Sequence, residues 1–408
     1  MRLLLLQYAG DYREAVQRFA AGGNENYYAQ KYTVNGIAEL TPHFEEVSVL
    51  CCQTDEFYNE VLDNGVRAIG AGFCGWVDEE KVVQLIEQQR PTHLVLHTPL
   101  RKVLRWAIKN QVKVLTLIAE SIVVQNWRDR LRGFRLARLL NHPQISWVGS
   151  YGLASSKRMK AIGVKADKII PWDLLIEPTP GSYEPKTLTQ ASEPWKLLYV
   201  GAISELKGVG DILRAVKILR DRQFPVRLSI VGKDSEGAFA RLAETLNVAD
   251  VVEFLGMIPT SEVVPQMRNA DAVLVPSRHE YTEGFPLTIH HALCSRTPII
   301  ASDHPMFQEH LKHEVNALIF PAQNPVALAA SIDSLFKNPS LYAALSQASY
   351  DTWYHLRLPV KWGDLLNRWV FPSSANDQWL YEHRLSAVSP QQKPIAIASS
   401  VKTPLSTR

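Results

Sequence analysis

The chain has 408 residues, of which 46% are hydrophobic and 21% charged, and its formal net charge is +3. This length exceeds what one hydrophobic core usually spans, so we expect two domains. So small a net charge argues against a dedicated nucleic-acid-binding protein. Its four cysteines show no metal-ligand spacing, which favours a reducing, cytoplasmic location.

Short apolar runs rich in branched residues alternate with helical patterns along the first half of the chain. We expect strands at 2–8, 46–52, 66–70, 93–97, 112–118 and 145–149, and a helix at 78–89. Such alternation is typical of a parallel sheet covered by crossover helices. The sequence therefore predicts a first Rossmann-like domain at residues 1–171.

The next segment is rich in proline, which can neither continue a helix nor sit in a central strand. We interpret 172–195 as a linker. Strands are expected beyond it at 196–201, 226–232, 251–256, 271–276, 298–302 and 316–320. These predict a second Rossmann-like domain at 196–352, then a helical segment at 353–383 that packs back on the first domain, and a disordered tail at 384–408.

Two doubly wound α/β domains joined by such a linker should face each other across a cleft, with ligands at the carboxyl ends of the strands. The sequence GAGFCG at 70–75 matches the glycine spacing of a dinucleotide-binding loop. However, the next strand ends in His97 and Thr98 instead of the acidic residue that holds a ribose. We therefore keep a dehydrogenase as a minor alternative and interpret 70–75 as a glycine-rich turn.

A strand, a loop and a helix follow one another between residues 271 and 295, and the loop carries Glu283. This glutamate precedes the sequence Gly284-Phe285-Pro286-Leu287, which suits a helix start because proline is tolerated in the first turn. The free amides of such a start bind phosphate. A carboxylate beside them can accept hydrogen bonds from hydroxyls, and His291 follows one to two turns inside the helix. A purely structural role also remains open for both side chains.

This order of elements resembles the donor-binding signature of glycosyltransferase family 4 (group 1), which are retaining enzymes of the GT-B fold. The resemblance implies that Glu283 contacts the transferred sugar and that the stretch Gly284, Phe285, Pro286 and Leu287, with free amides near Gly284 and Phe285, lies at the distal phosphate. The family's second glutamate, which holds the ribose, falls on His291. Glu280 is a second candidate for the sugar contact.

A second stretch, YVGAISELKGVGDILRA at 199–215, resembles the family's glycine turn and phosphate-binding basic pair. The resemblance places Gly201 in the turn and Lys207 in the pair, although a solvated lysine is the alternative. The arginine of the pair is Ala202 here. Gly232, Met257 and Ile258 fall on the family's nucleoside-side loops.

The resemblance is weaker before residue 150, where the family binds its variable acceptors. Gly22 and Gly23 look like a glycine-rich loop near the cleft, and Glu120 occupies a position where many relatives have histidine. His97 ends a strand where the family often has a catalytic histidine, with a structural histidine as the alternative. The segment 126–142 mixes five arginines with apolar residues, which suits an anionic membrane surface, a phosphorylated acceptor or an ordinary solvated helix.

The resemblance implies a retaining glycosyltransferase that moves a sugar from a nucleoside diphosphate sugar to a glycan or lipid-linked acceptor, as in polysaccharide biosynthesis for the cell envelope. No Asp-x-Asp pair occurs in the sequence, so we expect no metal and no other cofactor. A nucleotide-sugar epimerase and a non-catalytic homologue that serves as an assembly partner remain alternatives. We expect a cytoplasmic protein, with peripheral contact to the inner membrane face through 126–142.

Overall fold

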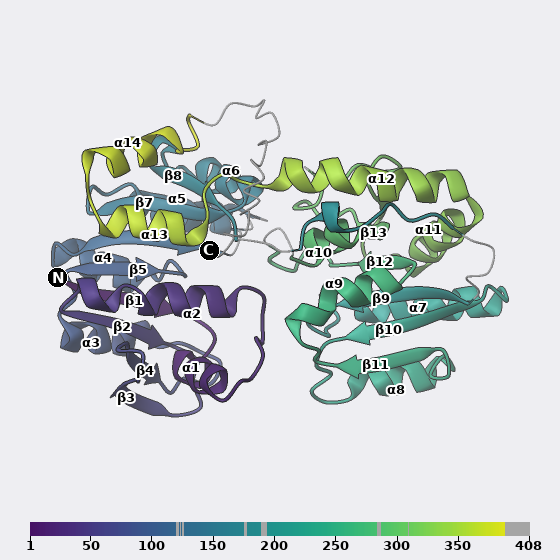
Figure 1. The fold of residues 1–408 in the computed structure, drawn as a ribbon, viewed down its shortest axis with the longest axis horizontal. Helices are drawn as coiled ribbons and strands as arrows, with labels where there is room; N and C mark the ends of the chain where they lie inside the picture. The colour runs from purple at the N-terminus through teal and green to yellow at the C-terminus, as the bar shows by residue number, and fades with distance from the viewer. Residues whose placement is uncertain are drawn as a thin grey trace, which may run out of the picture.

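A computed structural model describes residues 1–119, 122, 124, 126–174, 178–188, 194–283, 287–308 and 310–387. Within these residues the chain forms an eight-stranded and a six-stranded sheet, and helices lie on both faces of each (Figure 1). The two sheets form two separate lobes. Most of the predicted tail, from 388 to 408, lies outside the described residues.

The first sheet has the strand order β3-β4-β2-β1-β5-β6-β7-β8, with β3 antiparallel to β4 and the other pairs parallel. Its strands are β1 (Arg2–Gln7), β2 (Glu46–Cys51), β3 (Phe57–Val61), β4 (Arg67–Ala71), β5 (His93–Leu96), β6 (Lys113–Ile118), β7 (Ile145–Tyr151) and β8 (Ile169–Trp172). Leu3 and Leu5 of β1 pack against one helical layer, and Leu4 and Leu6 pack against the other. This alternation explains why the leucine run is buried on both faces.

Two layers of helices cover this sheet. They are α1 (Tyr12–Ala20) and α2 (Gln30–Ala38) on one face, and α3 (Glu79–Gln89), α4 (Arg101–Lys109), α5 (Trp127–Leu140) and α6 (Leu153–Ala161) on the other. Both edge strands, β3 and β8, were absent from the strands expected from sequence. Trp172, expected at the start of the linker, ends β8, and Pro171 is tolerated there because β8 is an edge strand.

The second sheet is parallel and has the order β11-β10-β9-β12-β13-β14. Its strands are β9 (Trp195–Val200), β10 (Val226–Val231), β11 (Val252–Gly256), β12 (Ala272–Val275), β13 (Ile299–Ser302) and β14 (Leu318–Phe320). Its helices are α7 (Val209–Asp221), α8 (Ala238–Thr245), α9 (Thr260–Asn269), α10 (Leu287–Ser295), α11 (Pro325–Lys337) and α12 (Pro339–Leu356). All six strands occupy positions expected from the sequence pattern.

The last described helices lie on the first domain. After α12 the chain crosses back, and α13 (Trp362–Val370) and α14 (Ser374–Glu382) cover the first sheet (Figure 1). Trp362 and Leu366 of α13 are buried in the same core as β1 and α2. Asp173, directly after β8, pairs with Lys361 as an isolated bridge, and this pairing attaches the crossover to the edge of the sheet.

The loop between α1 and α2 contacts the second domain. Thr260, the first residue of α9, donates a hydrogen bond of 3.1 Å from Oγ1 to Oε2 of Glu25. The Tyr28 ring packs edge-on against His291 of α10, with 4.8 Å between ring centroids. Ala154 of α6 is buried in the core of the second domain. These contacts bring the carboxyl end of β7 and the start of α10 to the same face between the domains.

Candidate active site

Glu283 lies in the loop between β12 and α10 and is 5% exposed. Its Oε1 accepts hydrogen bonds from Lys207 Nζ at 2.6 Å and from Ser277 Oγ at 2.7 Å. Ser277 is itself buried directly beyond β12, and its carbonyl accepts from Ser302 Oγ at the end of β13. The carboxylate is therefore held at the carboxyl ends of β12 and β13, where ligands bind in sheets of this type.

Lys207 precedes α7, and the chain can turn there because Gly208 adopts a φ of 75°. A Cβ on Gly208 would come within 2.2 Å of the Pro276 carbonyl oxygen, so the two loops approach more closely than any other residue would allow. The Lys207 ammonium also lies 4.2 Å from the centroid of the Tyr281 ring. Glu283 and Tyr281, both distant from Lys207 in sequence, thus contact the same ammonium group.

Arg278 does not replace the arginine that Ala202 lacks. Its guanidinium donates to Asp211 at 3.0 Å and to Glu205 at 2.5 Å. Asp211 lies in the first turn of α7 and is only 3% exposed. These charge-assisted bonds commit Arg278 to joining the loop to α7, and Lys207 remains the cation next to Glu283.

Gly201 and Gly232 end the neighbouring strands β9 and β10, and their backbones lie very close together. A Cβ on Gly232, whose φ is 151°, would come within 2.1 Å of the Gly201 carbonyl oxygen. Gly256, at the end of β11, accepts a hydrogen bond from the Gly232 amide. Beyond it the Met257 side chain is 62% exposed, whereas Ile258 packs on the core of the second domain. The glycine turns expected from the sequence therefore share one edge of the sheet.

His290 and His291 are both buried in α10. His291 Nε2 has no hydrogen-bond partner among the described residues, and the ring faces Tyr28 of the first domain. A nearly fully buried nitrogen without a partner is costly, which distinguishes His291 from an ordinary core histidine. The position that the resemblance assigned to the ribose thus lies where the two domains meet.

Other residues of the expected donor site have different fates. Leu287 opens α10 and packs against the cores of both domains, and Thr288 donates from Oγ1 to the Val200 carbonyl at 3.1 Å. Glu280 is exposed and accepts from Gln323, so it does not join the Glu283 cluster. Gly284, Phe285 and Pro286 lie outside the described residues.

The expected acceptor-side residues do not form one cluster. Gly22 and Gly23 follow α1, and a Cβ on Gly23 would meet Arg18, so this tight turn directs the loop toward Glu25 and Tyr28. His97 Nδ1 lies 3.2 Å from the Leu6 carbonyl, and its Nε2 accepts from the Trp362 indole at 3.3 Å. With both nitrogens engaged inside the first domain, the geometry favours the structural role for His97. Glu120 lies outside the described residues.

The sequence analysis missed four residues of the candidate site. Ser277, Tyr281 and His304 lie around the loop that carries Glu283, and Tyr28 contacts His291 from the first domain. His304 holds the loop, since its Nε2 donates to the Tyr281 carbonyl at 3.1 Å and its Nδ1 accepts from the Met306 amide. Burial lowers the pKa of His304, which favours this neutral tautomer. Single polar residues form no sequence motif. Ser277, Tyr281 and His304 could have been identified only by their positions after β12 and β13, and Tyr28, between α1 and α2, has no such signal.

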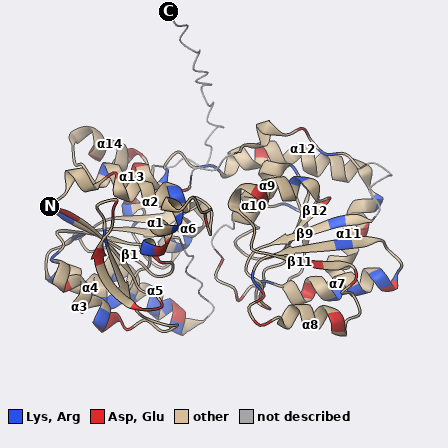
Figure 2. Cartoon of the chain, turned by 60° about the horizontal axis from the view of Figure 1, so that its bottom comes forward, with Lys and Arg blue, Asp and Glu red and all other residues tan. Residues whose placement is uncertain are grey.

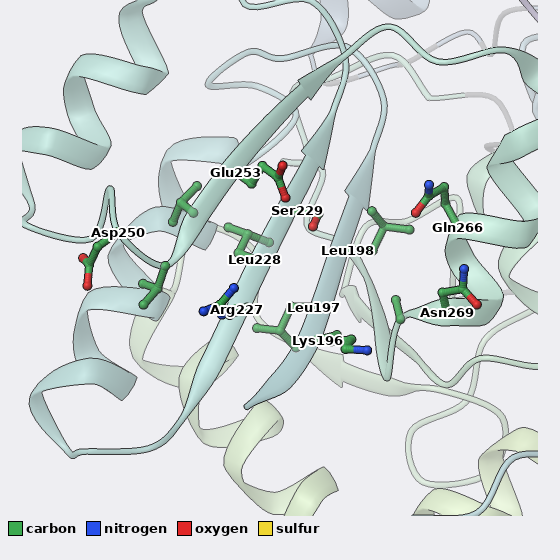
Figure 3. Close-up of a pocket in the computed structure, with 13 residues that line it drawn as sticks. Lys196, Leu197, Leu198, Arg227, Leu228, Ser229, Asp250, Glu253, Gln266 and Asn269 are labelled. Carbon is green, nitrogen blue, oxygen red and sulfur yellow. The ribbon is translucent and has the colours of Figure 1, made fainter. Parts of the chain in front are cut away.

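A hollow of about 540 Å³ lies on the second sheet between β9, β10, β11 and α9 (Figure 3). Lys196, Arg227 and Asp250 line it near the starts of the strands, at the opposite end of the sheet from Glu283. Within the described residues, no group of three or more His, Cys, Asp or Glu side chains is arranged to hold a metal ion. No helix of that part of the chain is long and apolar enough to cross a membrane.

The buried histidines predict acid sensitivity. Burial lowers the pKa of His97 and His291 from 6.5 to about 4, so the unfolded chain binds their protons first as the pH falls. Their contribution to stability is complete above pH 6.5 and decreases toward pH 4, by on the order of 3 kcal/mol per histidine. We expect the melting temperature to fall between pH 7 and pH 5.

His291→Gln should flatten this pH dependence, whereas His355→Gln, at an exposed position of α12, should leave it unchanged. Melting curves across this pH range, followed by circular dichroism, measure both effects. A melting temperature that stays constant down to pH 5 would contradict the assignment of neutral, buried histidines.

Residues 184–352 match the family model "Glycosyl transferases group 1". The chain is 27% identical over 177 residues to the amylovoran biosynthesis glycosyltransferase AmsK of Erwinia amylovora, a match that covers 42% of this chain and 43% of the relative. It is 29% identical over 182 residues to a D-inositol 3-phosphate glycosyltransferase of Thermobispora bispora, covering 42% of each. The matched region thus covers less than half the length of each of these two curated relatives.

Solved structures resemble nearly the whole chain. Sucrose-phosphate synthase from Thermosynechococcus elongatus superposes with a TM-score of 0.62 at 18% identity, covering 87% of this chain and 94% of that one. HepE of Anabaena in complex with UDP-glucose gives a TM-score of 0.58 at 14% identity, covering 95% and 100%. At these identities the likeness concerns the fold alone, and the fold is GT-B, with two α/β domains facing each other.

Proposed function

We propose, from the match of residues 184–352 to the family model of group 1 glycosyl transferases, that the chain transfers a sugar from a nucleoside diphosphate sugar to a glycan or lipid-linked acceptor. One observation carries the proposal. Buried Glu283 and Ser277 and half-buried Lys207 form a hydrogen-bonded cluster at the carboxyl ends of the strands of the second sheet. This cluster combines a carboxylate that can accept from sugar hydroxyls with a cation that can bind phosphate, and a hydrogen bond joins the two groups.

In this proposal Glu283 orients the transferred sugar, and Lys207 neutralises charge that develops on the leaving diphosphate. The free amides at the start of α10 supply further donors to the distal phosphate. The reaction retains the anomeric configuration, and the leaving phosphate accepts the acceptor's proton on the same face. It proceeds without a metal ion, because Lys207 and the helix amides supply the positive charge.

The nucleoside lies in this proposal along the edge formed by Gly201, Gly232 and Gly256. A flat base lies in this proposal beside Met257 and Ile258. His291 Nε2, which has no hydrogen-bond partner among the described residues, bonds a ribose hydroxyl. HepE, which shares the fold, has been solved with UDP and with UDP-glucose. A uridine diphosphate sugar is therefore the first donor to test.

Thermal shift with nucleoside diphosphates and their sugars tests the donor site. A ligand that binds only the folded chain raises the free energy of unfolding, by about 2.7 kcal/mol at a hundredfold excess over its Kd, and so raises the melting temperature. We expect at least one nucleoside diphosphate sugar to do so, and Lys207→Met to weaken its binding by at least about tenfold through loss of a charge-assisted contact. A shift with nicotinamide dinucleotides alone would instead favour a dehydrogenase.

Two alternatives share the donor site and are separated by products. An epimerase would convert the bound nucleotide sugar without an acceptor. A non-catalytic homologue acting as an assembly partner would bind the nucleotide without releasing nucleoside diphosphate, an alternative favoured by Ala202 and His291 at positions where the family has charged residues. Analysis of released nucleotide and sugar by chromatography distinguishes the three.

We also propose peripheral contact with the inner membrane face through 126–142. Asn126 caps α5 by accepting from the amides of Arg128 and Asp129, so the helix begins at the exposed Trp127. Figure 2 shows basic residues along α5. Such a mixture of arginines and exposed apolar side chains suits an anionic interface. Unchanged binding of an Arg128→Gln, Arg132→Gln variant to anionic vesicles would remove this proposal.

A further inference from the structure

The outer face of α5 carries an apolar stripe that no other described element covers. Trp127, Leu131 and Phe134 are spaced four and three residues apart, so they share one side of the helix. Their exposed fractions are 69%, 41% and 62%. The opposite side of α5, with Leu136 and Leu140, is buried in the first domain. The stripe is therefore additional to the apolar face that folding requires.

A hollow of about 500 Å³ begins beside this stripe, between α5 and the end of α6. Phe134 and Ile162 contribute apolar walls, and Arg130 and Arg158 contribute two guanidinium groups. The helices lie close together here, since a Cβ on Gly133 would come within 3.0 Å of Ile162. A hollow of this size is in the range of sites for small organic ligands.

The two arginines are available for a ligand. Neither the Arg130 guanidinium nor the Arg158 guanidinium forms a hydrogen bond or an ion pair with another described residue, whereas Arg132 on the outer surface pairs with Asp129. Two adjacent guanidinium groups on apolar walls match a phosphate attached to a hydrocarbon chain, because each fork can bond two phosphate oxygens. A soluble sugar phosphate would gain nothing from Phe134 or from the stripe beyond it.

The hollow also lies toward the candidate active site. Ala154, one turn before Arg158 in α6, is buried in the core of the second domain, so this part of α6 lies where the two domains meet. Burial is the main cause of the lowered pKa of His304, and the Arg158 charge contributes to it. His304 holds the Tyr281 carbonyl in the loop that carries Glu283. The two arginines form the polar part of the hollow, and Phe134 joins its apolar part to the exposed stripe.

We propose that Arg130 and Arg158 bind the phosphate of a lipid-linked acceptor, while its chain lies along Phe134, Leu131 and Trp127 in an anionic membrane. The inference rests on the proposed function, because it names the acceptor of that reaction. It assigns the two arginines to substrate binding, a role distinct from general attraction to a charged surface. Arg130 and Arg158 contact the phosphate, and the stripe contacts the chain.

Calorimetric titration of the full chain with geranyl phosphate, inorganic phosphate and geraniol tests the site. Geranyl phosphate should bind at least about tenfold more tightly than either of the other two, because only it has both the charge and the chain. The double variant Arg130→Gln, Arg158→Gln should weaken geranyl phosphate binding by at least about tenfold. Phe134→Ser should weaken it while leaving inorganic phosphate binding unchanged.

Arg105→Gln is the matched control, since Arg105 is an exposed arginine on α4 of the same domain. Equal weakening by Arg105→Gln, or equal affinity for inorganic and geranyl phosphate, would overturn the inference. Thermal shift with UDP in the same variants keeps the two proposals apart. UDP binding without geranyl phosphate binding would refute the acceptor site alone, and the reverse result would refute the donor site alone.

Discussion

Glu283→Gln should lower sugar transfer at least about 100-fold, as expected for loss of one preorganised polar contact at a reacting centre. The substitution keeps the size of the side chain but removes the charge that pairs with Lys207 at 2.6 Å. The sugar loses a strong acceptor, and Lys207 loses the carboxylate that positions its ammonium. Both effects act at the sugar and the phosphate rather than at the base.

Release of nucleoside diphosphate from the donor identified by thermal shift measures this effect. The affinity for UDP should change little, so turnover should fall while nucleotide binding remains. Glu280→Gln is the control, because Glu280 is exposed and bonded to Gln323. Transfer by the Glu283 variant at close to the unmodified rate, with its melting temperature preserved, would refute the role of Glu283.

Replacement of Asp173 by alanine should cost about 3–5 kcal/mol of stability, the usual result of removing one partner from a buried ion pair. Asp173 is 3% exposed, and its carboxylate accepts from Lys361 Nζ at 2.6 Å and from the Leu358 amide at 2.9 Å. Arg357 Nε lies 3.3 Å away. Burial raises the pKa of Asp173, against the effect of both cations, so the charge is costly. Its loss leaves two partly buried cations uncompensated.

Urea unfolding of the full chain at pH 7, followed by circular dichroism, measures this loss. Asp351→Ala, on the exposed side of α12, should change stability by less than about 0.5 kcal/mol. The Asp173 variant should also expose the crossover between α12 and α13 to protease, because Asp173 bonds that segment through both its backbone and its side chain. If the Asp173 variant resisted protease and its stability were unchanged, the segment between α12 and α13 would stay in place without the Asp173 carboxylate, which contradicts this prediction.

The strand pattern was predictable where strands are buried on both faces. Runs such as Leu3–Leu6 and Val273–Val275 are apolar throughout because helices cover both sides of the sheet. The edges were not predictable in the same way. In β3 only Tyr58 is buried, so the strand lacks an apolar run, and β8 contains Pro171, which the general rule on proline excludes from a strand.

The candidate site divides along similar lines. Glu283, Lys207 and the glycines after β9 and β10 were identifiable because a motif joins them to a strand end or a helix start. The partners that hold them were not. Tyr281 contacts Lys207, which is distant in sequence, and Ser277 bonds to Glu283 only because of the way the loop after β12 folds. For His97 the sequence left a catalytic and a structural role open, and the structure favours the structural role because both ring nitrogens are bonded.

The sequence alone determined the two α/β domains and the loops that carry the polar residues, because strand periodicity, glycine turns and helix starts are local properties of the chain. Only the tertiary structure decided which of those residues meet. The Glu283–Lys207 pair, the contact of Tyr28 with His291 and the hollow between α5 and α6 each depend on segments that fold together from distant positions. Tertiary packing, within each domain and between the two, sets these distances, and no local pattern in the sequence encodes them.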